Sequence, residues 1–283
     1  MPTSILARAE TFAMTAKANG HAFSISLARP MVETPDSPIV IVLDAGVTFG
    51  TATEAATFRG AMGALSPAVV VGVGYDADML TTLRLRTRDL TPPAPADKYL
   101  EMAAMMGTEF GGADAFLSFL LDDLIPEVRR RAPEASETRR VLFGHSLGGL
   151  FAAHALLTRP ESFETFVASS PSLWWNDFAT LKLVDGFAAR LAERGASPRV
   201  LVEIAAREQD EPDKAAPGLT LEVTRERVRE ARMVDTGREF AETLKGFPLA
   251  ELKFVCFEDE DHASVMPAAV GRAMTFALTP RQE

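Results

Sequence analysis

The sequence predicts an α/β protein built on a doubly wound, mostly parallel sheet. Short, almost continuously apolar runs rich in β-branched residues recur along the 283 residues, as expected for strands that helices cover on both faces. Helical patterns separate these runs, so strand and helix alternate over the whole length. No Pro/Gly-rich linker and no internal repeat divides the chain, and we therefore expect a single domain over residues 1–283.

The predicted elements follow one another in a simple order. Two segments with alternating apolar residues come first, at 11–14 and 21–27, and we expect antiparallel strands at one sheet edge. The apolar runs expected to form the remaining strands are 39–43, 68–73, 141–143, 163–168, 200–205 and 252–257. The helical patterns are 53–62, 113–131, 147–157, 178–194, 220–247 and 262–277.

One stretch, about 83–112, departs from the alternation. It contains the proline cluster Thr91-Pro92-Pro93-Ala94-Pro95 and later Gly111-Gly112. A loop this long inside a compact domain is usually functional or disordered. It follows a predicted strand on the carboxyl side of the sheet, where open α/β folds bind ligands. We expect this insertion to roof the site, with a plain surface insertion as the alternative.

Composition excludes several classes of protein. The net charge of −10 argues against a nucleic-acid partner, because phosphate binding needs concentrated Lys and Arg. The single cysteine, Cys256, excludes an intramolecular disulfide and is expected as a buried strand thiol; no cysteine cluster suggests a metal site. No stretch approaches 18 apolar residues, and the N-terminus lacks the pattern of a secretory signal. A cytoplasmic protein without a membrane span is the expectation, and the oligomeric state is not readable.

The segment 141–150 carries the strongest functional signal. An apolar strand leads into Gly144-His145-Ser146-Leu147-Gly148, and a helical pattern starts at once. Strand, tight turn and helix in this order are what a nucleophile elbow requires. Gly144 and Gly148 are expected where neighbouring backbone passes close to the turn. The Leu147 amide, at the helix N-terminus, can donate a hydrogen bond to an oxyanion.

A serine nucleophile needs a base, and the chain holds four histidines. His21 begins an edge strand, His154 lies two turns along the helix after the elbow, and His145 is expected to point away from the serine hydroxyl. His262 follows the last apolar strand, where a fold with the chain order Ser, acid, His places its base. Position and elimination therefore select His262 as the base for Ser146.

The acid that orients the imidazole is expected in the loop after 200–205. Glu208 is the first candidate there and Asp210 the second. Two alternatives stay open. In the first, Asp259 or Asp261, which lie beside His262 in the sequence, forms the hydrogen bond to its imidazole instead. In the second, a Ser-His dyad works without a buried acid.

The oxyanion needs a second donor, which is expected in the turn 43–50 after an early strand. Gly46 is the candidate, because a bare backbone approaches a substrate closely. Asp44 is expected to tie this turn together through its side chain.

Further residues are candidates to contact substrate. Trp174 and Trp175, the only tryptophans, follow the strand 163–168 and would wall an acyl pocket, or else pack against the roof. The arginines of 84–89, Arg88 among them, alternate on what we expect to be an extended segment. They would hold an anionic group of the substrate, or form a solvated face.

Several segments resemble one branch of the α/β-hydrolases, the esterases that include siderophore (enterobactin-type) trilactone esterases, S-formylglutathione hydrolases and some acyltransferases. The elbow Gly144 to Gly149 is typical of the superfamily. The segments closest to the siderophore-esterase members are Val71-Gly72-Val73-Gly74-Tyr75, Arg88-Asp89-Leu90-Thr91-Pro92, Gly111-Gly112-Ala113-Asp114-Ala115-Phe116, Ser170-Pro171-Ser172-Leu173-Trp174-Trp175 and Glu260-Asp261-His262. The resemblance spans roughly residues 24–277. One departure is the oxyanion turn, where the branch reads Leu-Asp-Gly and this chain has Leu43-Asp44-Ala45-Gly46.

The resemblance implies the α/β-hydrolase fold, with Ser146 as nucleophile and His262 as base. Together with the residues above, it predicts a serine carboxylic-ester hydrolase that acts through a covalent acyl-enzyme on a small-molecule ester, without cofactor or metal. A siderophore-type ester is the substrate class that the resemblance suggests. The alternatives are an acyltransferase using the same site and a non-catalytic binding protein on the same fold.

Overall fold

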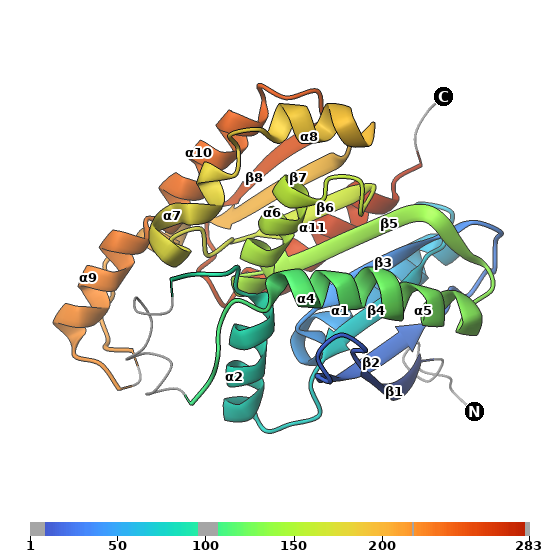
Figure 1. The fold of residues 1–283 in the computed structure, drawn as a ribbon, viewed down its shortest axis with the longest axis horizontal. Coiled ribbons are helices and arrows are strands. Elements are labelled where there is room, and N and C mark those ends of the chain that lie inside the picture. Colours follow the sequence, from blue (N-terminus) through green and yellow to red (C-terminus); the bar gives the residue numbers. More distant parts are fainter. Residues whose placement is uncertain (1–8, 96–106, 217, 281–283) are drawn as a thin grey trace.

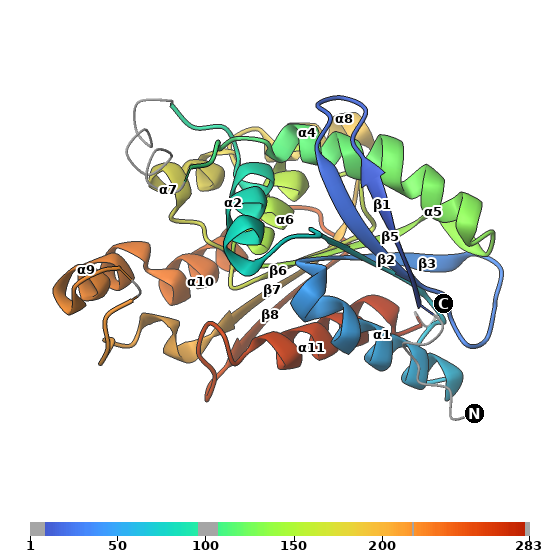
Figure 2. The same ribbon diagram turned by 90° about the horizontal axis from the view of Figure 1, so that it is seen from below.

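One eight-stranded sheet runs through the chain, with helices on both of its faces (Figures 1 and 2). The computed structural model describes residues 9–95, 107–216 and 218–280. The strand order is β1-β2-β4-β3-β5-β6-β7-β8. β1 pairs antiparallel with β2 and β2 antiparallel with β4, whereas all other neighbours are parallel. The mostly parallel sheet with antiparallel N-terminal edge strands is thus confirmed.

Each predicted strand is present, with bounds that differ by a few residues. The strands are β1 Ala9–Thr15, β2 Ala22–Ala28, β3 Ser37–Leu43, β4 Val69–Gly74, β5 Ala135–His145, β6 Thr165–Ser169, β7 Arg199–Ala205 and β8 Glu251–Phe257. The inner strands β3, β4, β6 and β7 are buried along their whole length, which is why their sequences are continuously apolar rather than alternating.

The helices form a layer on each face of the sheet. α1 (Ala45–Ala61) and α11 (Met266–Leu278) lie together on one face (Figure 2). The opposite face carries α2 Met79–Leu90, α4 Ala113–Ser118, the π-helix η3 Phe119–Leu124, α5 Ile125–Arg131, α6 Leu147–Thr158, α7 Trp175–Lys182, α8 Phe187–Arg194 and α10 Met233–Leu244. α9 (Leu221–Ala231) extends beyond the end of the sheet (Figure 1).

The expectation of a loop from residue 83 onward is wrong for residues 83–90, which belong to α2. The apolar residues of this helix do not mark its buried face. Met79, Leu80 and Leu83 are exposed, whereas the polar Thr87 and Asp89 are buried. Only residues 91–95 and 107–112 of the expected insertion are described and irregular, and 96–106 lie outside the described residues.

Two long helical patterns are each interrupted. The pattern 178–194 is divided between α7 and α8, and 220–247 between α9 and α10. Arg232, with a φ of 46°, separates the latter pair, and a left-handed residue ends a right-handed helix. The pattern 113–131 runs through α4, η3 and α5 without a break.

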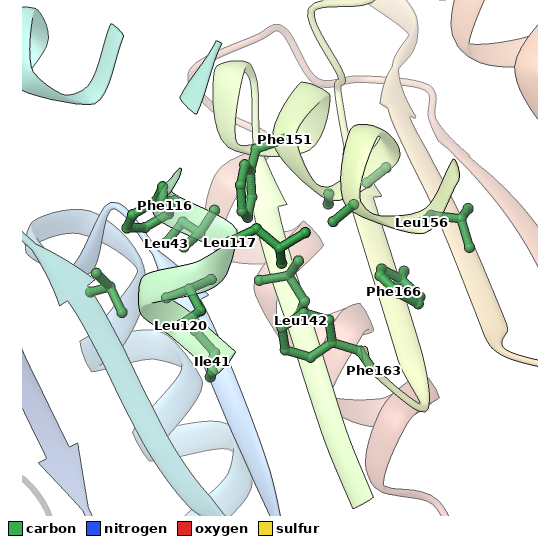
Figure 3. Close-up of a cluster of buried hydrophobic side chains, with 14 of the residues drawn as sticks. Ile41, Leu43, Phe116, Leu117, Leu120, Leu142, Phe151, Leu156, Phe163 and Phe166 are labelled. Atoms are coloured by element: carbon green, nitrogen blue, oxygen red, sulfur yellow. The ribbon is translucent and has the colours of Figure 1, made fainter. Parts of the chain in front are cut away.

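A buried apolar cluster fixes α6 on the sheet (Figure 3). Phe151 and Leu156 of α6 lie over Leu142 of β5 and Phe166 of β6, and Phe116 from α4 reaches the same cluster. All five side chains are at most 2% exposed. Each contributes on the order of 1.5–3 kcal/mol of burial free energy, so the helix that follows Ser146 is held firmly.

Two further expectations concern the single cysteine and membrane spans. Cys256 lies on β8 and is unpaired, but it is only partly buried. Within the described ranges, none of the helices combines the length and apolarity needed to cross a bilayer.

Candidate active site

Ser146 occupies a strained turn between β5 and α6. Its φ of 61° and ψ of −118° are unusual for a residue with a side chain, and such strain persists only where surrounding bonds enforce it. The Ser146 amide donates to the Ser169 carbonyl at 3.0 Å, and the Ser172 amide donates to the Ser146 carbonyl at 3.1 Å. Bonds from the next strand and its loop thus hold the serine in place.

Two glycines make this turn possible. A Cβ on Gly144 would stand 2.0 Å from the Gly148 carbonyl oxygen, and one on Gly149 would stand 2.5 Å from the Ser169 carbonyl oxygen. Gly144 is therefore required, as predicted. The expectation for Gly148 is wrong, because a Cβ there would find its nearest neighbour at 3.5 Å. The second close approach belongs to Gly149.

Ser146, His262 and Glu208 form a continuous chain of hydrogen bonds. His262 Nε2 lies 3.0 Å from Ser146 Oγ, and His262 Nδ1 lies 2.6 Å from Glu208 Oε1. Glu208 sits in the 3-10 turn η4 (Ala206–Gln209) directly after β7, and its side chain is 1% exposed, against 45% for His262. The Arg207 amide donates to the Glu260 carbonyl at 3.1 Å, which ties the two loops together.

The alternative carboxylates lie elsewhere. Asp210 is exposed and pairs with Arg207 at 3.4 Å. Asp261 accepts the amides of Ala263 and Ser264, each at 2.9 Å, and these backbone hydrogen bonds lower its pKa. Asp261 therefore shapes the turn that carries His262, whereas Glu208 is the carboxylate that the structure brings to the imidazole ring.

Both predicted oxyanion donors lie in first turns of helices, where backbone amides lack an intrahelical acceptor. Leu147 is the first residue of α6 and Gly46 the second residue of α1. Asp44 precedes α1 in a left-handed conformation, with a φ of 57°. Its side chain does not cap α1, so it does not tie the turn together as expected; its carboxylate instead accepts two hydrogen bonds from Arg86 of α2, both of 2.8 Å.

The arginines of residues 84–89 lie on α2 and not on an extended segment, so this expectation is wrong. Arg88 donates twice to Asp89, at 2.8 Å each. Asp89 is 1% exposed and also binds His21 at 2.9 Å and the Tyr75 hydroxyl at 3.1 Å. The guanidinium of Arg88 thus belongs to the network around Asp89 that anchors α2.

The two tryptophans differ in their surroundings. Trp175 is 2% exposed, its indole N–H donates to the Pro92 carbonyl at 3.1 Å, and its ring lies 5.3 Å from that of Phe110. It therefore packs against the flanks of the predicted roof, which was the alternative interpretation. Trp174 is 36% exposed and remains available to a ligand.

His145 has a role at the site that its position in the motif did not reveal. It contacts the loop of His262, with Nε2 2.9 Å from the His262 carbonyl oxygen. His154, by contrast, pairs with Asp114 at 2.7 Å on the far side of α6. Strand order gave no signal for this contact, because His262 follows β8, which is not a neighbour of β5 in the sheet.

A strained serine between a parallel strand and a helix, with an acid after the next-to-last strand and a histidine after the last, defines an α/β-hydrolase. A family model described as "Putative esterase" matches residues 22–242. The chain belongs to this family, and it is an enzyme that hydrolyses esters.

Similar proteins come from fungi and bacteria. The siderophore triacetylfusarinine C esterase of Aspergillus fumigatus is 37% identical over 84% of this chain and 80% of its own. The ferri-bacillibactin esterase BesA of Bacillus subtilis is 34% identical over 94% and 88%. Among solved structures, siderophore hydrolase EstA from Aspergillus nidulans has a TM-score of 0.81 at 29% identity, covering 95% of this chain and 93% of its own.

Proposed function

We propose that the chain is a serine carboxylesterase that forms a covalent acyl-enzyme at Ser146. The observation that supports this most is the unbroken hydrogen-bond chain from Glu208 through His262 to Ser146. A buried carboxylate on Nδ1 selects the tautomer that leaves Nε2 free to accept a proton, and it stabilises the imidazolium that forms. The strained turn at Ser146 presents the hydroxyl to a substrate.

The reaction proceeds in two halves. Ser146 Oγ attacks the ester carbonyl carbon while its proton moves to His262 Nε2, and the Leu147 and Gly46 amides stabilise the oxyanion. Collapse breaks the bond to the alcohol, which takes the proton from His262 and leaves. Water then loses a proton to His262 as it attacks the acyl-enzyme, and Ser146 Oγ regains that proton as the carboxylic acid departs.

A siderophore-type ester is the substrate class we propose. The relatives named above are described as esterases of triacetylfusarinine C and of ferri-bacillibactin, and the chain covers most of their length. The half-exposed Trp174 offers an aromatic surface next to Ser172, whose hydroxyl lies 3.4 Å from that of Ser146. Hydrolysis of these two esters, iron-loaded and iron-free, should exceed that of p-nitrophenyl acetate in kcat/KM. The reverse order would remove the substrate class and leave the esterase.

Side-by-side assays of variants test the assignment of roles. Ser146→Ala should abolish p-nitrophenyl acetate hydrolysis and labelling by a fluorophosphonate. Glu208→Gln should lower kcat by about 10⁴-fold, as loss of the orienting acid does in serine hydrolases. Asp210→Asn, two residues away and exposed, is the matched control and should match the wild type. Equal activity of Glu208→Gln and wild type would instead establish a Ser-His dyad.

A further inference from the structure

A row of polar residues crosses the carboxyl ends of three neighbouring strands beneath the proposed base. His145 of β5 is in register with Ser169 of β6, and Ser169 with Glu203 of β7. They lie on the sheet face covered by α1 and α11, where the neighbouring positions are filled by apolar residues such as Phe143 and Val167. His145 is 6% exposed and the other two are fully buried. Buried polar groups are normally hydrogen-bonded, so the partners of these three side chains require an explanation.

The hydrogen bonds of His145 define its tautomer. Its Nε2 lies 2.9 Å from the His262 carbonyl oxygen, which can only accept, so Nε2 must carry a proton. Its Nδ1 lies 3.2 Å from Ser169 Oγ. In the neutral ring Nδ1 is a bare acceptor, so the Ser169 hydroxyl donates to it. Both ring nitrogens of His145 then have the hydrogen-bond partner that their protonation requires.

Burial favours the uncharged form of both titratable residues in the row. Burial, with the nearby His262, lowers the pKa of His145 to about 4, against the opposing influence of Glu208 and Asp44. Burial raises the pKa of Glu203 well above its ordinary value, against the weaker effects of Arg272 and Ser169. At neutral pH the ring of His145 therefore adds no charge beside the imidazole of His262, whose centroid lies 4.7 Å from its own.

We propose that His145 is a positioning residue: Ser169 fixes it as the neutral Nε2–H tautomer, and it donates that proton to the His262 carbonyl. We call this hydrogen bond the clamp, because it fixes the loop that carries His262. The hydrogen bond between Glu208 and His262 Nδ1 separately orients the imidazole ring. The inference rests on the proposed function, because it assigns His145 a part in holding His262 for that reaction. An uncharged clamp also lets His262 become an imidazolium without a like charge beside it.

A matched pair of amide variants in the full chain tests the clamp. In His145→Gln the side-chain amide reaches the former Nε2 position and can still donate to His262, whereas in His145→Asn it reaches only the Nδ1 position near Ser169. His145→Asn should lower kcat for p-nitrophenyl acetate about tenfold with KM within about twofold, and His145→Gln should stay within about threefold of wild type. His154→Asn, an equally buried histidine bonded to Asp114, is the control.

Equal kcat for the two His145 variants, whether high or low, would overturn the clamp. Imidazole ¹⁵N shifts of the folded wild type give a second test that needs neither a variant nor activity. His145 should titrate below pH 6 and show the Nε2–H tautomer at pH 7. A charged ring or the Nδ1–H tautomer would overturn the proposal. A wild type without esterase activity but with this tautomer would refute the proposed function and leave the hydrogen bond standing.

Discussion

At the scale of single residues, two buried carboxylates near Ser146 are each paired with a basic side chain. Glu208 meets His262, and Asp44 meets Arg86, in each case with a carboxylate that is largely buried. For His145 and Glu203, burial favours the uncharged form: it lowers the pKa of His145 to about 4 and raises the pKa of Glu203 well above its ordinary value. In these low-dielectric surroundings, an unpaired charge would strongly destabilise the folded state.

Glu203→Gln should become more stable than the wild type as pH rises. The folded state keeps the proton on Glu203, whose pKa is raised, whereas the unfolded chain loses it above about 4.5. The unfolded state then binds fewer protons, so wild-type stability falls with rising pH, and Gln removes this slope. Urea unfolding at pH 5 and pH 8 should show the difference between the proteins grow by at least about 1 kcal/mol. A difference that is constant with pH would contradict a protonated Glu203.

Arg86→Met should impair catalysis through the oxyanion turn. Arg86 and Asp44 are each about one-sixth exposed and share two hydrogen bonds, so removing the guanidinium leaves the carboxylate uncompensated. We expect kcat to fall about tenfold and the free energy of unfolding to fall by about 2 kcal/mol. The double variant Asp44→Asn/Arg86→Met should recover stability in urea unfolding. If the free energy of unfolding of the double variant is no higher than that of Arg86→Met alone, the two residues are not energetically coupled.

At the scale of elements, α2 is held by its polar C-terminal turn. Asp89 bonds His21, which precedes β2, Tyr75, which follows β4, and Arg88 beside it. The apolar residues at the start of the helix face solvent. An element that is anchored by one carboxylate depends on that residue far more than on its hydrophobic pattern.

Asp89→Ala should therefore lower the free energy of unfolding by about 3 kcal/mol, because it leaves three partly buried donors without their acceptor. Asp78→Ala, at the other end of α2, is the control. Asp78 caps the Leu80 and Thr81 amides in solvent, so its loss should cost about 1 kcal/mol. Chemical denaturation of both variants measures the contrast, and similar losses would show that the network is not the anchor.

The same helix shows why part of the fold was not predictable. Strands such as β3 and β7, covered on both faces, produce continuous apolar runs that predict them directly. In the helix α2, Asp89 is buried and Met79 is exposed, so the apolar pattern does not show which side of the helix is buried. Its stability comes from partners that are distant in sequence, and a single sequence does not reveal those contacts.

At the scale of the whole molecule, one sheet edge collects every residue of the candidate site. Ser146, Glu208 and His262 each follow the carboxyl end of a different strand. Chain order and strand position predicted Ser146 and His262 for this edge, but they left Glu208 as the first of several candidate acids. The contact of His145 with His262 and the bonding of Arg88 to Asp89 were not predictable, because they depend on side-chain direction and on the unexpected α2.

The overall charge predicts how salt affects turnover. The net charge is −10, and Arg86 and Arg88 are both already bound to carboxylates. For an anionic ester, kcat/KM should rise as ionic strength increases from about 0.01 M to about 0.15 M, since the Debye length falls from about 30 Å to about 8 Å. A neutral ester should show little change. A decrease for the anionic ester would indicate a local positive field that outweighs the net charge.

The contrast in exposure between His262 and Glu208 has a consequence for the fate of the acyl group. The Glu208 side chain is 1% exposed, whereas nearly half of the His262 side chain is exposed to solvent. Among the described residues, the His262 ring is open to bulk water, which it would activate in the proposed reaction. Competing alcohols have no privileged access to that ring, so acyl groups should be shared between water and alcohol according to their concentrations. Hydrolysis is then the default outcome of an open imidazole, and acyl transfer would require a surface that shields it.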